Sequence, residues 1–171
     1  MKKLILLAIV LIASTGMDAQ SYKWWAGGRT NFWEGDNATS FGIAPEVGYH
    51  LSPKFTLAAS LGFQTNIQKY SSFSRKTNAF LLNPYIRYTA FRSGNVLGFV
   101  DGGFELGLGD IDGFQIGFKP GIAILLTDRW TAATQFGFIG YNDGYGIADR
   151  NKGIGFDFSG YCTTIAFFYS F

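Results

Sequence analysis

Residues 114–126 read FQIGFKPGIAILL, and their side chains sort into two sets with a period of two. One set is aromatic or aliphatic apart from a proline: Phe114, Ile116, Phe118, Pro120, Ile122, Ile124 and Leu126. The other is dominated by smaller residues and includes one lysine: Gln115, Gly117, Lys119, Gly121, Ala123 and Leu125. Alternation with a period of two is the pattern of a β-strand, and a strand that crosses a bilayer at a tilt needs about 9 to 11 residues plus its ends. The length and pattern therefore predict a membrane-spanning strand.

The small-residue face indicates which side of this strand faces lipid. A face turned to bulk water would carry Lys, Glu and Thr, whereas Gly and Ala suit the cramped lumen of a barrel of about eight strands. We therefore place the small residues inside and the apolar residues toward lipid. A register shift of one residue would move Lys119 into the hydrocarbon, at a cost of about 2 to 4 kcal/mol near the midplane.

Seven further segments alternate in the same way, the first of them least regularly. They are 22–33, 41–51, 55–68, 77–91, 96–109, 130–141 and the residues after 153. Outward-facing positions in the segment 130–141 are predicted to include Ala132, Thr134, Phe136 and Phe138. Short connections at 52–54, 92–95 and 127–129 alternate with mostly longer, more polar ones, including 69–76 and 142–153. This predicts an all-β protein, an eight-stranded antiparallel up-and-down transmembrane β-barrel with both termini at the periplasmic side. A count of ten strands stays open because of the irregular first segment.

A repeat of about one hairpin supports the count of eight strands. Pro45, Pro84 and Pro120 stand 39 and 36 residues apart, and each begins an alternating run that ends in a polar turn. Proline provides no N–H to a β-ladder and normally avoids interior strands. Because the alternation continues across all three prolines, the sequence alone does not explain how the strands accommodate them.

The first twenty residues have the pattern of a secretory signal peptide. Lys2 and Lys3 precede an apolar run at 4–13, and small or polar residues surround Ala19, which predicts cleavage near Ala19 or Gln20. The run is far shorter than the roughly 20 residues that a spanning helix needs. Residues 21–171 are then a single barrel domain. The formal net charge of +2 indicates no strongly basic surface for nucleic acid, and the lone Cys162 excludes an internal disulfide.

The alternation places six charged residues on the inward face, three of each sign. They are Arg29, Arg87 and Lys119 together with Glu46, Asp101 and Glu105. Unpaired buried charge is costly, so we expect a closed, ion-paired and hydrogen-bonded core. The polar residues Gln64, Asn83, Tyr85 and Gln135 are expected to take part. In the alternative, the same groups are solvated in a small internal water channel.

The signal peptide, the eight alternating segments and the terminal Tyr169, Ser170 and Phe171 together resemble the small OmpX/OmpA-type outer-membrane barrels. The pattern also looks like the outer-membrane barrel-domain proteins common in Bacteroidetes-type bacteria. The resemblance covers the whole mature chain and implies a monomer surrounded by outer-membrane lipid. In such proteins the barrel-insertion machinery reads a C-terminal Phe preceded by alternating aromatic residues. The matching positions here are Ile165, Phe167, Tyr169 and Phe171.

Enzymes are known among small outer-membrane barrels, including lipid A deacylases and palmitoyltransferases. Their chemistry needs a polar catalytic group near the outer leaflet. The only histidine, His50, is predicted at the periplasmic end beside Ser52, as a polar pair facing a turn. One His and one Cys do not make a structural zinc site, and the acidic loop residues are scattered. These loop residues are Asp110, Asp112, Asp143 and Asp149. Gly107, Gly109 and Gly113 do not resemble a phosphate-binding loop, because no helix is expected after them. We therefore predict no catalytic, cofactor or metal site.

Two functions remain at this stage. The first is a closed structural or surface-interaction scaffold without enzymatic activity, and the second is a narrow porin-like diffusion channel. Four aromatic residues in or near the external loops are candidate contacts for a surface partner, or else an upper girdle at the lipid interface: Tyr70, Phe73, Tyr141 and Tyr145. The sequence names no ligand and no partner beyond the lipid and the insertion machinery.

Overall fold

The computed structural model of the chain describes residues 22–34, 38–69, 74–110, 113–145, 152–158 and 164–171. These residues form ten strands: β1 Trp24–Glu34, β2 Ala38–His50, β3 Phe55–Lys69, β4 Ser74–Ser93, β5 Val96–Gly109, β6 Gly113–Leu125, β7 Trp130–Gln135, β8 Phe138–Asp143, β9 Gly153–Asp157 and β10 Thr164–Ser170. Within the described ranges, no helix has the length and apolar character needed to cross a membrane. The predicted signal peptide at 1–20 lies outside the described residues, as does Cys162.

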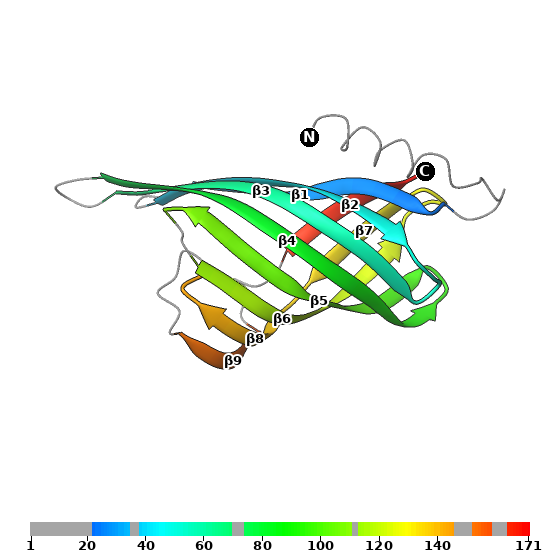
Figure 1. Cartoon of the computed structure of the whole chain (residues 1–171). Coiled ribbons are helices and arrows are strands. Elements are labelled where there is room, and N and C mark those ends of the chain that lie inside the picture. Colours follow the sequence, from blue (N-terminus) through cyan, green and yellow to red (C-terminus); the bar gives the residue numbers. More distant parts are fainter. Residues whose placement is uncertain (1–21, 35–37, 70–73, 111–112, 146–151, 159–163) are drawn as a thin grey trace, which may run out of the picture.

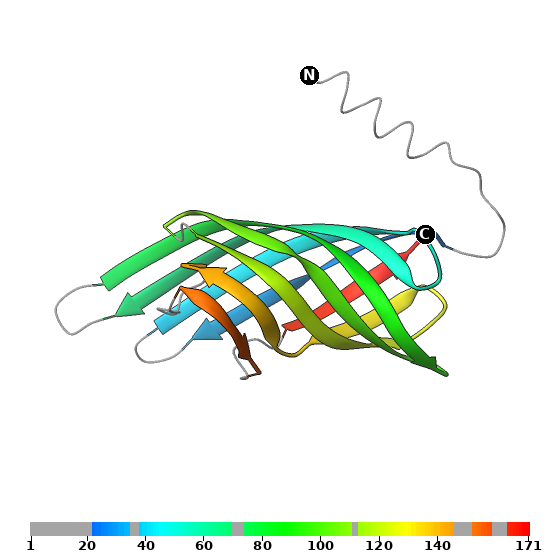
Figure 2. The ribbon, with the colours of Figure 1, turned by 60° about the horizontal axis from the view of Figure 1, so that its bottom comes forward.

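The strands close into an eight-stranded antiparallel barrel (Figure 1), which confirms the predicted fold class. Its ring is formed by β1 to β7 in order and then β10, which pairs back onto β1. The hairpin of β8 and β9 extends the wall at the end away from the C-terminus, where β8 pairs with the outer half of β6 (Figure 2). The ring thus has the predicted count of eight strands. The predicted eighth strand, after residue 153, contains both β9 and β10, and only β10 belongs to the ring.

Three short connections lie at the same end of the barrel as the C-terminus (Figure 2). They are 51–54, 94–95 and 126–129, and we call this end of the barrel the turn end. At the opposite end, the predicted loop 69–76 is shorter than expected, because β3 runs to Lys69 and β4 starts at Ser74. The two strands continue pairing there beyond Ala79, where the pairing of β4 with β5 ends.

The predicted seventh strand is broken at Phe136 and Gly137 into β7 and β8. Gly137 has a φ of 101°, which is unfavourable for other residues, and the register against β6 moves by one residue across it. The bulge reverses the alternation. Phe138 was predicted to face outward, and this was wrong: it is buried in the lumen, whereas Ile139 is 46% exposed.

Apart from this reversal, the two faces of the barrel wall have the predicted character. The most exposed large side chains include Leu61, Phe80, Phe118 and Ile165, each at least 60% exposed on the outer face. The lumen instead holds polar and charged side chains between small residues and a few aromatic rings. Small residues are required there, because a Cβ at Gly121 would lie 2.3 Å from the Phe99 ring. Polar groups inside and apolar groups outside reverse the arrangement of a water-soluble barrel.

Aromatic pairs surround the outer face at the turn end. The ring centroids are 4.7 Å apart in Trp24–Tyr49 and 5.2 Å apart in both Phe55–Tyr88 and Trp130–Tyr169. Each pair bridges two neighbouring strands. A belt of amphipathic rings at one level is typical of a barrel whose wall passes from hydrocarbon to headgroups at that height.

The three strand prolines lie at interruptions of the β-ladder. At Pro45, β2 keeps its pairing with β1 but loses its pairing with β3. At Pro84, β4 keeps its pairing with β3 but loses its pairing with β5. At Pro120, β6 changes partner from β8 to β7, and the Pro120 carbonyl accepts from the Phe136 N–H at 3.0 Å. A residue without an N–H is tolerated at these points because the ladder is already broken on one side.

Candidate functional site in the barrel lumen

The six inward charges come together in the lumen from five strands of the wall. Arg29 lies on β1, Glu46 on β2, Arg87 on β4, Asp101 and Glu105 on β5, and Lys119 on β6. The strand register sets their order: Arg87 is directly opposite Asp101, and Asp101 is directly opposite Lys119. Inward positions repeat every second residue, so each charge has an opposite charge within reach on its own or a nearby strand.

The best-formed ion pair joins Arg87 to Asp101. The guanidinium Nε lies 2.7 Å from Oδ1 of Asp101 and Nη2 lies 2.8 Å from Oδ2, so the contact is bidentate. The amide of Gln135 donates a third hydrogen bond to Asp101 Oδ2 at 2.6 Å. The Arg87 guanidinium also lies 3.9 Å from the centroid of the Phe99 ring. Its other aromatic neighbours within 6 Å are Trp25, Tyr85 and Phe168.

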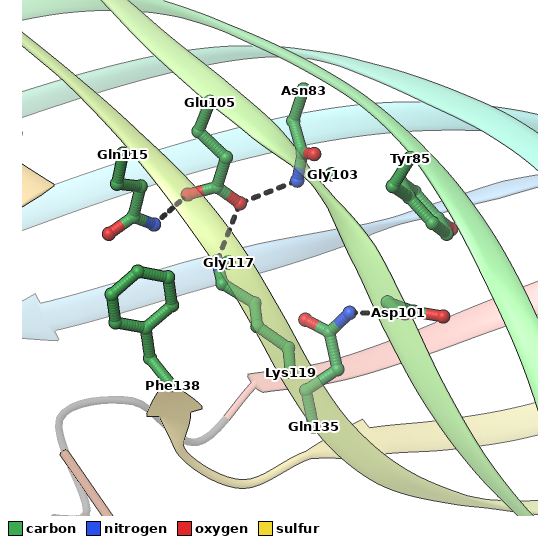
Figure 3. A pocket seen from close by; sticks show the side chains of 10 residues that line it. All are labelled: Asn83, Tyr85, Asp101, Gly103, Glu105, Gln115, Gly117, Lys119, Gln135 and Phe138. Atoms are coloured by element: carbon green, nitrogen blue, oxygen red, sulfur yellow. Dashed lines mark hydrogen bonds and ion pairs between the residues drawn. The ribbon is translucent and has the colours of Figure 1, made fainter. Parts of the chain in front are cut away.

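Glu105 accepts the largest number of contacts (Figure 3). Its Oε1 lies 2.5 Å from Lys119 Nζ and accepts from Asn83 Nδ2 at 2.5 Å. Its Oε2 accepts from Gln115 Nε2. The Tyr145 hydroxyl also hydrogen-bonds to this carboxylate. Glu105 is therefore held by donors from several directions, which compensates the cost of removing the charge from water.

The third pair, Arg29 with Glu46, is looser and is linked through Gln135 to the Arg87–Asp101 pair. Arg29 Nη2 lies 3.8 Å from Glu46 Oε2, and the Tyr85 hydroxyl donates to Glu46 Oε1. Arg29 Nη1 donates to Gln135 Oε1 at 3.2 Å, and Gln135 in turn donates to Asp101. Gln135 thus links two ion pairs into one network. Of the polar residues expected to take part, Asn83, Tyr85 and Gln135 do so.

A cavity lies among these side chains (Figure 3). The cavity between them has about 10 Å³ available to the centre of a water-sized sphere, which is room for about one water molecule. Ten residues line it: Asn83, Tyr85, Asp101, Gly103, Glu105, Gln115, Gly117, Lys119, Gln135 and Phe138. Gln115 Oε1 is the one buried side-chain N or O atom without a hydrogen-bond partner in the described part of the chain. A water in this cavity could donate to it.

Tyr145 contacts the lumen network from the end of the barrel opposite the turn end. We predicted Tyr145 as an external contact, but its side chain points inward to Glu105. Asn142 holds it there, since Oδ1 accepts from Tyr145 N at 3.0 Å and Nδ2 donates to Tyr145 O at 3.1 Å. Burial raises the pKa of Tyr145, which follows the end of β8, and the Glu105 carboxylate raises it further. The phenol therefore stays protonated and able to donate. The spacing of Asn142 and Tyr145 is the sequence signal that could have predicted this turn.

The other predicted contact residues are dispersed. Tyr141 lies near Phe114, with ring centroids 5.8 Å apart. Tyr70 and Phe73 lie outside the described residues. In the C-terminal strand, Ile165 is 61% and Phe167 53% exposed, in alternation with the buried Ala166 and Phe168, so the insertion pattern lies on the outer face. Tyr169 packs against Trp130, and Phe171 is also exposed.

His50 does not pair with Ser52 as predicted. Its Nδ1 lies 2.7 Å from Thr56 Oγ1 on β3, and Ser52 Oγ instead accepts from the backbone N–H groups of Lys54 and Phe55. Ser52 therefore stabilises the turn. Within the described ranges, no group of three or more His, Cys, Asp or Glu residues could hold a metal. Asp110 accepts from the Asn78 N–H at 2.8 Å and Asp143 pairs with Lys152, whereas Asp112 and Asp149 lie outside these ranges.

Comparison with solved structures gives distant likenesses. No protein-family model matches the sequence, and no curated protein matches it significantly. Among solved structures, the chain is similar to the outer membrane enzyme PagL, at 12% identity and a TM-score of 0.38, over 86% of this chain and 96% of that one. It is also similar to the NanC porin, at 10% identity and a TM-score of 0.37, over 92% and 88%. Similarity at this level supports no conclusion about activity.

Proposed function

We propose that this chain is an integral β-barrel of the bacterial outer membrane, a monomer that acts as a closed structural or surface-interaction scaffold and has no enzymatic activity. The apolar outer face and the aromatic belt at the turn end support the membrane location. The termini and short turns then lie in the periplasm. The proposal includes export by the signal peptide and recognition of the C-terminal strand by the insertion machinery.

The ion-paired and hydrogen-bonded packing of the lumen is the observation that carries the scaffold proposal. Three ion pairs lie in the lumen, Gln135 links two of them, Tyr145 contacts Glu105 of the third, and the cavity beside Glu105 and Lys119 has room for about one water. Ions that pass through a barrel need a continuous water-filled path, and eight-stranded barrels are just wide enough for their own side chains. This arrangement favours a sealed barrel over a porin-like channel.

Single-channel recording tests the proposal. The mature chain is refolded, its folding is verified by heat-dependent gel mobility, and current is recorded in a planar bilayer. We expect the wild type to be silent. A charge-neutral double variant, Glu105→Ala with Lys119→Ala, removes the largest hub of the network and should conduct, which shows that the assay detects an opened lumen.

Phe118→Ala is the matched control, because Phe118 is adjacent in sequence but lies on the outer face. It should stay silent. Steady openings of the wild type that change in Arg87→Ala or Glu46→Ala would make the protein a small pore and refute the sealed scaffold.

A further inference from the structure

A group of three side chains at the turn end is not part of the lumen network. Arg129, in the connection between β6 and β7, donates from Nε to the Tyr22 hydroxyl at 2.9 Å and from Nη1 to the Tyr169 hydroxyl at 2.7 Å. Its guanidinium carbon lies 5.1 Å from the Tyr22 ring centroid and 5.9 Å from that of Tyr169. An exposed arginine is normally free to move among many rotamers. Here two tyrosines from opposite ends of the chain hold it in one orientation.

The group presents hydrogen-bond donors outward. Two of the five guanidinium N–H groups are used by the tyrosines, which leaves the others available on an exposed side chain. Each tyrosine hydroxyl accepts from Arg129, so its own hydrogen is free to donate to another acceptor. Donors from one guanidinium and two phenols around a single positive charge match the oxygens of a phosphate monoanion.

The charges around this group also favour an anion. The described charged side chains of the turn end are Lys23, Lys54, Arg92, Asp128 and Arg129. Four of these are basic and one is acidic. The positive excess attracts anions to the whole rim. Arg129 differs from the other cations because its geometry is fixed by two hydroxyls.

The position of the group favours an anion that is part of a lipid. Tyr169 packs edge-on against Trp130, 5.2 Å between centroids, and both belong to the aromatic belt. On the outer face of β10, the exposed Phe167 and Ile165 continue from Tyr169 toward the middle of the barrel wall. A phosphate bound at Arg129 would therefore have its acyl chains directed along an apolar surface.

We propose that Tyr22, Arg129 and Tyr169 form a binding site for the phosphate of an anionic phospholipid in the periplasmic leaflet. This inference rests on the proposed membrane location. The guanidinium and the two hydroxyls bind the phosphate oxygens, and the apolar surface beyond Tyr169 packs against the acyl chains. The site fixes the height of the turn end relative to the headgroups.

Native mass spectrometry of the folded barrel in micelles, titrated with dimyristoyl phosphatidylglycerol or dimyristoyl phosphatidylcholine, tests the site. The wild type should retain one phosphatidylglycerol about fivefold more tightly than phosphatidylcholine, the size of preference that an exposed charge-assisted contact supports. Arg129→Ala should abolish the preference. Arg92→Ala is the matched control, because Arg92 is an exposed arginine at the same end whose Nε bonds only a backbone carbonyl, at 3.4 Å; it should keep the preference.

The double variant Tyr22→Phe with Tyr169→Phe keeps both rings, so it should fold normally while losing most of the preference. Equal losses in the Arg129 and Arg92 variants would show a diffuse basic surface and refute a site. Glycerol 3-phosphate binding with the same dependence on Arg129 would refute a lipid ligand. Insertion into lipid vesicles is measured separately: a barrel that inserts but shows no preference refutes only this inference, whereas a barrel that does not insert refutes the proposed function as well.

Discussion

Removing Arg87 should destabilise the barrel far more than removing an exposed cation. The side chains of Arg87 and Asp101 are only 12% and 4% exposed, and two hydrogen bonds of 2.7 and 2.8 Å join them. Arg87→Met fills much of the same volume beside Phe99 but leaves the Asp101 carboxylate buried without its cation. Breaking a buried pair in this way costs about 3 to 5 kcal/mol.

Two further variants separate this cost from general damage to the core. Adding Asp101→Asn to Arg87→Met removes the uncompensated charge and keeps an acceptor for Gln135, so at least half of the lost stability should return. Lys152→Met breaks the Lys152–Asp143 pair, which has a similar separation of 2.8 Å but is 68% and 31% exposed. That exposed pair should contribute about 0 to 1 kcal/mol.

Urea unfolding in detergent micelles, followed by tryptophan fluorescence, measures these free energies of unfolding. Gel mobility with and without heating checks that each variant reaches the folded state. If Arg87→Met lowers the free energy of unfolding no more than Lys152→Met does, the lumen is hydrated enough to screen the charge of Asp101. That result would refute a dry, interdependent core of ion pairs.

Two further predictions concern the wall of the barrel. Gly137→Ala should lower the free energy of unfolding by about 1 to 3 kcal/mol, because it imposes a side chain on a φ of 101° and places its Cβ 2.3 Å from the Phe158 ring. Gly155→Ala is the control, because its Cβ would meet nothing within 4 Å. This substitution should change the free energy of unfolding by less than about 0.5 kcal/mol in the same urea assay. Phe118→Lys should reduce the folded fraction in lipid vesicles, at a cost of about 2 to 4 kcal/mol, whereas Phe118→Leu should not. Equal folding of the two Phe118 variants by heat-dependent gel mobility would contradict the assignment of the outer face to lipid.

Much of the wall was predictable because strand alternation is local. The predicted range of β5 has the same bounds in the structure, and β6 is displaced by a single residue at each end. The inward positions of Arg87, Asp101 and Glu105 follow from the same period of two. The bulge at Gly137 was not predictable in this way. A glycine in a strand has no distinguishing pattern until the register of the neighbouring strand shows that one residue is extra.

The alternation of apolar and small residues was sufficient to establish an all-β barrel with an apolar exterior and a charged lumen, since each strand position has only two faces. The pairing of particular charges depends on register, closure and side-chain reach across the lumen. Gln135 joins two ion pairs from strands far apart in sequence, and Tyr145 turns inward because Asn142 holds its backbone. Likewise, Tyr22 and Tyr169 meet at Arg129 only because β10 closes the ring on β1. The Asn142–Tyr145 turn is local, whereas the contacts of Gln135 and Arg129 link residues far apart in the sequence. Only the closed tertiary structure could bring those residues together.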